Sequence, residues 1–180
     1  EMAIGMSSPR PAIRLQLDAG HGVHLVQSNN SAIDHTAAML DFTAKKLPQL
    51  ADLSGYIVCA KSPSCGMERV RLFDAAGQQL GKQGGGLYTR QLMQHYPWLP
   101  VEEDGRLFDP ELKENFICRV FSCYDYQQTM QDGFSVGKLV AFHSRYKFLV
   151  MAHSPVAYRE LGRLVASAKL FSAQELQQRY

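Results

Sequence analysis

The first hundred residues combine short stretches of alternating and continuous apolar character. Residues 13–17 and 23–26 alternate apolar and polar side chains, which predicts two short strands around a turn at residues 18–22. Residues 56–60 form an apolar run with a β-branched centre, which predicts a buried strand with Cys59 in the core. The other elements predicted in this half are a helix over 34–47, a strand over 69–73 that closes at 74–78, and a helix over 87–96 that is ended by Pro97 and Pro100.

The second half carries helix-start signals in close succession. Asp109 followed by proline predicts a helix to residue 131, and Ser135 predicts the next helix, to residue 152. Ser154 followed by proline starts a third helix, and Ser172 with Glu175 forms a capping box for a fourth. Residues 101–106 precede these helices and are interpreted as an acidic linker. This half is therefore predicted to be helical throughout.

These patterns together predict two domains. The first, over residues 1–100, is an α/β domain with a small, mostly parallel sheet and helices, and the second, over residues 101–180, is an all-α helical domain. The chain starts at Glu1 with no methionine before it, and it ends within a helical pattern. We therefore expect the first domain to be truncated at its N-terminus and the second at its C-terminus.

Composition narrows the class of protein. Of the 180 residues 46% are hydrophobic and 20% are charged, which is typical of a globular protein. No apolar run is long enough to cross a membrane, and no signal-peptide pattern is present. We expect a cytoplasmic protein with no membrane partner. The cysteines are then interpreted as thiols or metal ligands and not as disulfides; they are Cys59, Cys65, Cys118 and Cys123.

Charge is distributed unevenly in the second half. Residues 101–137 contain 8 acidic and 3 basic residues, whereas residues 138–170 contain 6 basic residues and one acid. The basic stretch is either a solvated face or an anion-binding surface for nucleic acid. Arg145 and Lys147 lie close together in the sequence, and Arg159 and Arg163 share one helical face that would hold an RNA backbone. In the alternative interpretation, the nearby His143 and His153 are interior polar groups that hold helices together.

The loop at residues 61–66 carries the best candidate for chemistry. Cys65 lies between a proline-containing turn and a glycine, directly after the strand predicted at 56–60. The positive charge of nearby Lys61 favours the thiolate, the form that binds metal or attacks as a nucleophile. Proline before the cysteine and glycine after it allow the backbone to approach a cofactor closely. The alternative is that this single loop cysteine is structural or incidental.

Several sequence motifs around this loop occur in the order found in a known family. They are IG at 4–5, PRPAIRL at 9–15, SGYI at 54–57, CGMERV at 65–70 and GGGLY at 84–88. The first hundred residues thereby resemble the thiouracil desulfidase family. Residues 101–170 resemble a helical domain of unassigned role that is often fused to it, through PVEEDGRL at 100–107, ENFI at 114–117, FHSRYK at 142–147 and AHSPVAYRELGRLV at 152–165. This combination resembles tRNA 4-thiouridine desulfidases.

The resemblance implies a cofactor and a ligand. Desulfidases of this family hold a 4Fe–4S cluster through three cysteines, and the open iron takes the sulfur of a thiolated pyrimidine. Cys65 matches the third cluster cysteine, as a metal and cofactor ligand. The other two lie earlier in the family, so both would precede Glu1, which resembles the glutamate of a Pro-Glu pair. The remaining cysteines match no cluster position, so we expect this chain by itself to lack an intact cluster; either the sequence is only an ordered or engineered part of the protein, or this form is inactive.

Three further residues are candidates for catalysis. Ser62, three residues before Cys65, is placed to relay a proton or, alternatively, to cap the turn. Lys61 is a candidate for orienting a substrate carbonyl, or a surface residue, and Glu1 is a candidate general base. The glycines at 84–86 either bind an anion or a base edge through backbone N–H groups, or form a flexible loop.

The function that follows is iron–sulfur-dependent, non-redox desulfuration of thiolated uracil with release of sulfide. The basic helical domain favours 4-thiouridine within tRNA over the free base, because a free base needs no second, basic domain. The alternatives are a desulfidase of free thiouracil and a non-catalytic accessory protein that binds nucleic acid. The sequence leaves the oligomeric state open.

Overall fold

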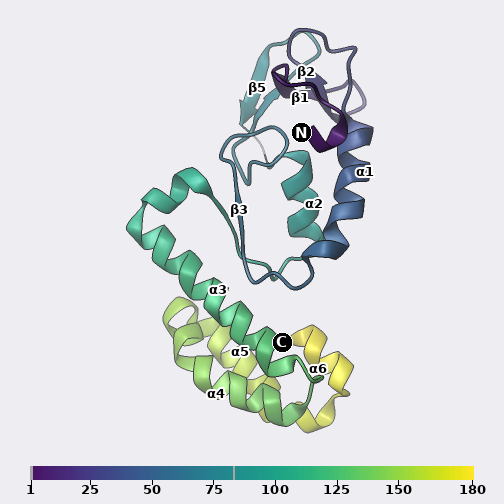
Figure 1. The fold of residues 1–180 in the computed structure, drawn as a ribbon. Helices are drawn as coiled ribbons and strands as arrows, with labels where there is room; N and C mark the ends of the chain where they lie inside the picture. Colours follow the sequence, from purple (N-terminus) through teal and green to yellow (C-terminus); the bar gives the residue numbers. More distant parts are fainter. Residues whose placement is uncertain (1, 83) are drawn as a thin grey trace. The chain divides into compact units, whose positions relative to one another are not determined.

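The computed structural model describes residues 2–82 and 84–180, which divide into two compact units with the boundary between Val120 and Phe121. The boundary falls inside a helix, whereas the sequence places a domain boundary at residue 100. The boundary at residue 100 separates the two regions of sequence resemblance, and it stays a prediction. The two units are described separately below (Figure 1).

The first unit contains two small sheets. Strands β1 (Ile13–Leu17), β2 (Val23–Gln27), β4 (Arg71–Phe73) and β5 (Gln79–Lys82) form one sheet in the order β2-β1-β4-β5. In this sheet β1 pairs with β4 in parallel, and the β1–β2 and β4–β5 pairs are antiparallel. Strands β3 (Tyr56–Val58) and β6 (Val101–Glu103) form a second, parallel pair. The predicted α/β class is confirmed, although the sheet is mixed and not mostly parallel as expected.

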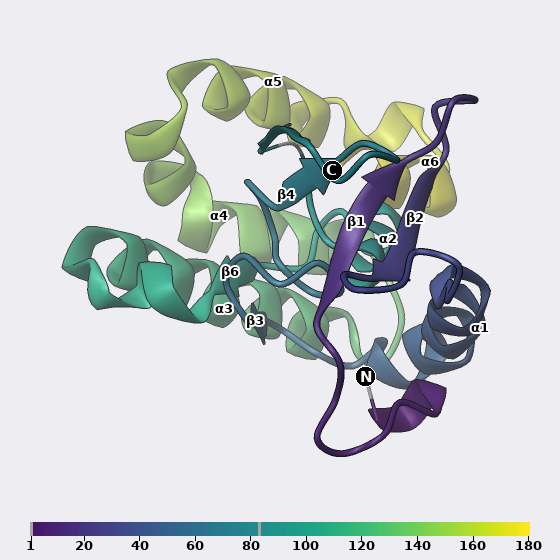
Figure 2. The same cartoon turned by 90° about the horizontal axis from the view of Figure 1, so that it is seen from above.

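Two helices pack together beside these strands. They are α1 (Thr36–Lys46) and α2 (Leu87–His95), and 3-10 turns occur at Met2–Ile4, Leu47–Leu50 and Asp104–Phe108 (Figures 1 and 2). The core between helices and strands contains fully buried leucines from both, namely Leu15, Leu25 and Leu92. Burial of such side chains is the main favourable contribution to folding of this unit.

The expectation of an acidic linker at residues 101–106 is wrong. Val101–Glu103 is a strand whose residues pair in register with β3, and Glu102 and Glu103 are both buried. The strand β5 was not predicted, because its side chains are mostly exposed and polar and give no alternating pattern. The strand expected over 56–60 is shorter than predicted, and its central Ile57 is 55% exposed.

The second unit is helical, as the sequence predicts. It begins within α3 (Pro110–Met130) and continues through α4 (Val136–His153), α5 (Pro155–Ala166), a 3-10 turn (Ala168–Leu170) and α6 (Ala173–Arg179). The predicted caps are confirmed: the side chains of Asp109, Ser135, Ser154 and Ser172 accept backbone N–H groups of the helices that follow them. Its core is small and centres on Leu139, Ala168 and Leu176. None of the helices in the described part of the chain has the length and apolar composition needed to cross a bilayer.

Candidate functional site

Cys65 lies in a tight turn that follows β3. The N–H of Gly66 donates to the carbonyl of Ser62 at 2.8 Å. The Ser62 hydroxyl accepts the N–H of Cys65 at 3.4 Å and hydrogen-bonds the Ser64 hydroxyl at 3.0 Å. Lys61 opens the turn with a φ of 62°, in the left-handed region that non-glycine residues adopt only where the surrounding structure holds them there. These contacts show Ser62 capping the turn, whereas its role in proton transfer stays a prediction.

The N-terminal end of α2 anchors this turn. Four donors from the N-cap and first turn of α2 bond four successive carbonyls of the turn. They are the N–H of Gly86 to Gly66 at 2.8 Å, the N–H of Leu87 to Pro63 at 3.3 Å, the N–H of Tyr88 to Ser64 at 2.9 Å, and the hydroxyl of Thr89 to Cys65 at 2.7 Å. A Cβ on Gly86 would lie 2.4 Å from the carbonyl carbon of Ser64, so only glycine allows this approach. The interpretation of residues 84–86 as an anion site or a flexible loop is therefore wrong at Gly86, whose N–H is used by the turn.

A buried carboxylate holds the chain just after the turn. Glu103, which is 6% exposed, accepts the N–H groups of Met67 at 2.9 Å and of Glu68 at 3.3 Å. The neighbouring Glu102 accepts from the Arg106 Nε at 2.7 Å, and an Arg106 terminal nitrogen contacts Glu68 at 2.8 Å. These positioning residues were not predicted from the sequence. The available signal was an arginine four residues after Glu102, a spacing that pairs charges across one turn.

Cys65 lines a cavity of about 500 Å³, a volume typical of small-molecule sites. Aromatic rings form part of its wall: Tyr88 packs against Phe42 and Tyr56 with ring centroids 6.1 and 6.2 Å apart, and the two tyrosine hydroxyls are 3.1 Å apart. Burial and this hydrogen bond raise the pKa of Tyr88 well above its usual range, so its phenol stays protonated. Cys59 also lines the cavity and is exposed, so the expectation that it belongs to the core is wrong.

The cavity wall contains both predicted catalytic residues that the structure describes, together with the predicted ligand. Lys61, Ser62 and Cys65 all line it, as do Arg10 and Lys46. Glu1, the third residue with a predicted catalytic role, lies outside the described residues. The predicted catalytic and ligand residues that the structure describes therefore lie together at one cavity.

A whole iron–sulfur cluster does not fit the donors of the described residues. Residues 2–82 and 84–180 contain no group of three His, Cys, Asp or Glu side chains that could hold a metal ion. Two thiols, Cys59 and Cys65, line the cavity, and Cys118 and Cys123 lie on α3 and are half-buried. A cluster of the kind implied by the resemblance takes three thiolates. The described residues therefore supply part of such a site and not all of it.

The basic residues of the helical unit divide by their contacts. Arg145 donates to Asp125 and to Thr129, each at 2.8 Å, and this ties α4 to α3. Lys147 lies over the ring of Phe148 at 5.0 Å. The side chains of Arg159 and Arg163 are exposed on α5 and make no ion pair with any residue in the described ranges. These two arginines are therefore available to an external anion.

The two histidines of this unit behave differently. His143 is buried and lies 3.3 Å from the Tyr180 hydroxyl, as expected of an interior polar group. Burial, assisted by Lys147, lowers the pKa of His143. His153 is exposed at the end of α4, so the same expectation is wrong for this residue.

Comparison with known families identifies the first unit. The family described as 2-thiouracil desulfurase matches residues 1–104, more than half of the chain. The chain belongs to this family. The match includes the Cys65 turn, the anchoring end of α2 and the strand β6, which are the elements that form the cavity wall and hold the turn. Residues 147–180 match a second family, described as a protein of unknown function, DUF1722, which confirms the expected second resemblance in the C-terminal region.

A curated relative is similar over a shorter segment. The uncharacterized protein YbgA of Escherichia coli (strain K12) is 36% identical to this desulfurase-family chain over 53 residues. The matched segment is 29% of this chain and 31% of that protein, so the chain spans about a third of the relative's length. None of the solved structures matches significantly.

Proposed function

We propose that this protein removes sulfur from thiolated uracil and that the base binds in the Cys65 cavity. In the reaction a thiocarbonyl and water become a carbonyl and hydrogen sulfide, with no net oxidation or reduction. Membership of the 2-thiouracil desulfurase family supports this chemistry. The observation that carries the proposal for this chain is the cavity itself, in which a rigidly held cysteine lies beside aromatic rings that suit a flat base.

The wall of the cavity provides both stacking and polar contacts for the substrate. The rings of Phe42, Tyr56 and Tyr88 offer stacking surfaces, and the protonated Tyr88 phenol offers a hydrogen bond to an exocyclic oxygen or sulfur. In this proposal Lys61 orients the substrate's remaining carbonyl and Ser62 moves a proton at the departing sulfur. Glu1 would act as the general base that activates water.

The iron–sulfur cluster forms a separate part of the proposal. Cys65 is proposed as this chain's ligand to a 4Fe–4S cluster, since its turn is anchored by four hydrogen bonds from α2 and its side chain lines the cavity. The described residues supply fewer thiolates than a cluster takes, so they account for substrate binding and proton movement and not for the chemistry of the cluster.

The proposed substrate is 4-thiouridine within tRNA. Support comes from the second unit, where Arg159 and Arg163 are exposed four residues apart on α5 and Lys147 lies on α4. Such cations contact phosphates independently of sequence, which suits a domain that holds a tRNA while another domain acts on one base. Arg145 would contribute charge to this surface while remaining paired with Asp125.

Turnover of two substrates tests the proposal. The full-length protein, purified without oxygen, is incubated with free 4-thiouracil and with tRNA that carries 4-thiouridine, and released sulfide is measured for each. We expect kcat/KM for the tRNA to exceed that for the free base by more than tenfold, about 1.4 kcal/mol of transition-state binding. Equal or better turnover of the free base would instead support the free-thiouracil desulfidase. Sulfide from neither substrate would leave a nucleic-acid-binding accessory protein.

A further inference from the structure

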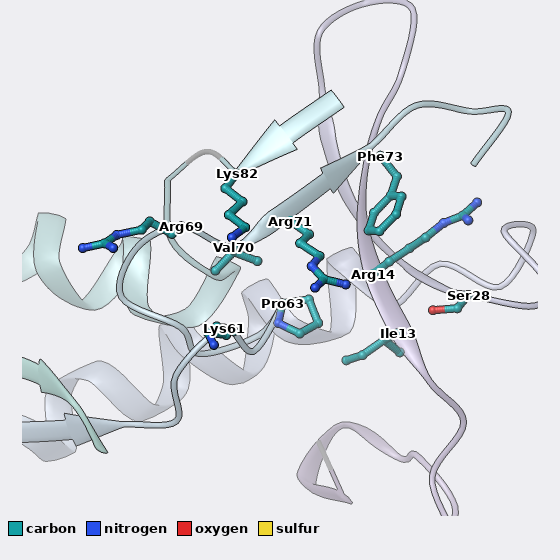
Figure 3. A pocket seen from close by; sticks show the side chains of 10 residues that line it. All are labelled: Ile13, Arg14, Ser28, Lys61, Pro63, Arg69, Val70, Arg71, Phe73 and Lys82. Atoms are coloured by element: carbon teal, nitrogen blue, oxygen red, sulfur yellow. The ribbon is translucent and has the colours of Figure 1, made fainter. Parts of the chain in front are cut away.

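A second cavity in the first unit is lined by an unusual set of charges. It has a volume of about 450 Å³ and lies where β1, β4 and β5 approach the Cys65 turn. Five of its ten lining residues are cationic and none is acidic; the cations are Arg14, Lys61, Arg69, Arg71 and Lys82. In Figure 3 the Arg71 side chain reaches toward Pro63 and the Lys82 side chain toward Val70, whereas the guanidinium groups of Arg69 and Arg14 lie at opposite ends.

Among the described residues, no acidic side chain neutralises the charges at the centre of this cavity. Lys61, Arg71 and Lys82 make no ion pair with any side chain in residues 2–82 and 84–180, whereas Arg69 is paired with Glu68 at 2.8 Å. Arg14 bonds Gln16 through a terminal nitrogen, but its buried Nε has no hydrogen-bond partner. An unpaired buried donor costs free energy that a bound acceptor would recover.

The sheet itself places two of these cations against each other. Arg71 of β4 and Lys82 of β5 are direct partners in the antiparallel register. Like charges directly opposite each other destabilise a strand pair unless an anion lies between or above them. Lys61 and Arg69, on the other wall, both have left-handed backbones, with φ of 62° and 53°. The cavity thus combines concentrated positive charge with two left-handed backbones, a conformation that clusters at ligand sites when non-glycine residues adopt it.

Phosphate is the anion that this arrangement fits. Guanidinium groups bind phosphate oxygens through paired N–H donors, and lysines add point charges to the same site. A concave surface with one sign of charge raises the local concentration of such anions. The cavity also contains apolar side chains, Ile13, Val70 and Phe73, against which a sugar would pack.

The position of the cavity indicates which phosphate it holds. Lys61 and Pro63 line both this cavity and the Cys65 cavity, so the two are separated only by the Cys65 turn. We propose that the basic cavity binds a backbone phosphate of the RNA substrate, next to the nucleotide whose thiolated base enters the Cys65 cavity. This inference rests on the proposed function for its choice of RNA, but it concerns binding and can be tested without turnover.

A charge-matched pair of double variants of the full-length protein tests the inference. Arg71→Gln with Lys82→Gln removes the two opposed cations, both of which are exposed, so the fold is expected to persist. Lys45→Gln with Lys113→Gln removes two exposed lysines of the same unit that do not line the cavity. Binding of an unmodified single-stranded RNA is measured by fluorescence anisotropy over a range of salt concentrations.

The inference predicts a loss specific to the first double variant. Its slope of log affinity against log salt should flatten by about 1.4, the value for two phosphate contacts on a single strand, and its affinity at low salt should fall at least tenfold. The Lys45/Lys113 variant should differ little from the parent protein, and turnover of free 4-thiouracil should be retained by both. Binding of free inorganic phosphate is measured alongside. Parental RNA affinity and slope in the Arg71/Lys82 variant would overturn the inference, even if that variant bound inorganic phosphate less tightly.

Discussion

At the scale of single residues, His24 is held between two carboxylates. Its Nδ1 lies 2.8 Å from Asp34 Oδ2, and its Nε2 lies 3.0 Å from Asp18 Oδ2. The hydrogen bond with Asp34, followed by that with Asp18, raises the pKa of His24 above its ordinary value. Since both ring nitrogens donate only in the protonated form, the imidazolium is the form that these two carboxylates stabilise.

The raised pKa gives a stability prediction with a definite sign. The stabilisation by protonated His24 is fully present below its unfolded pKa of about 6.5 and is lost as the pH rises through the higher folded pKa. The free energy of unfolding of the parent, minus that of His24→Asn, should therefore fall between about pH 6 and alkaline pH. Urea unfolding at several pH values measures this difference, from which the opposite contribution of His143 cancels. A difference that rises with pH would contradict the account.

Single residues also show where prediction from the sequence succeeds and fails. The turn that carries Cys65 is predictable because proline and glycine within the same loop determine the local backbone. The exposure of Cys59 is not predictable, because it depends on where β3 ends, and a shift of one residue along a strand moves a side chain to the other face. Glu103 was missed because its role depends on N–H groups 35 and 36 residues away in the chain.

At the scale of elements, local signals again decide what is predictable. The helices of the second unit begin at capping residues that bond their own first turns, so short sequence windows predict them. The strand β6 is not predictable in this way, since its two buried glutamates have the composition of an exposed acidic linker. Its burial is possible because Arg106 and the N–H groups after the Cys65 turn satisfy those carboxylates. Such compensation is a tertiary feature that no local pattern shows.

The packing of α2 against the Cys65 turn predicts an asymmetry between two glycine substitutions. Gly86 has an ordinary φ of −62°, so Gly86→Ala should act through the clash with Ser64 and not through backbone strain. We expect a loss of about 1–3 kcal/mol of stability and a displaced Cys65 turn. Gly162→Ala in α5, where nothing lies within 4 Å, should instead stabilise by about 0.5–1 kcal/mol.

Thermal unfolding and turnover of 4-thiouracil measure the effects of these two substitutions. The account requires Gly86→Ala to lose both stability and turnover, while Gly162→Ala retains turnover. If Gly86→Ala unfolds and turns over as the parent does, α2 does not position the turn as described.

At the scale of the whole molecule, the chain joins a unit with a cysteine-lined cavity to a helical unit with exposed cations. The order of the two units follows from the sequence, because strand-like and helix-like patterns occupy separate halves. The basic residues of the second unit were predicted together to bind nucleic acid. In the structure Arg145 is paired with Asp125, whereas Arg159 and Arg163 are exposed. That difference depends on which side chains α3 presents to α4, which the sequence pattern does not specify.

The second unit yields its own binding prediction. Replacing Arg159 and Arg163 together by glutamine should weaken binding of tRNA and flatten its salt dependence by about 1.8 if each arginine neutralises one phosphate of a duplex region. Turnover of free thiouracil should persist, because the Cys65 cavity belongs to the first unit. Filter binding across salt concentrations measures the slope, with Lys45→Gln/Lys113→Gln as the charge-matched control. An unchanged slope would mean that the α5 cations are merely solvated.

The role of Cys65 is the central claim, and one comparison tests it most directly. Cys65→Ala and Cys118→Ala make the same chemical change in the full-length protein, but only Cys65 lines the cavity. After purification without oxygen, iron content and sulfide release from 4-thiouracil are measured for both. Loss of partners around a metal ligand already costs about 10–100-fold, so loss of the ligand itself should cost more. The account predicts that Cys65→Ala loses iron and turnover while Cys118→Ala keeps both; parental iron and turnover in Cys65→Ala would contradict it.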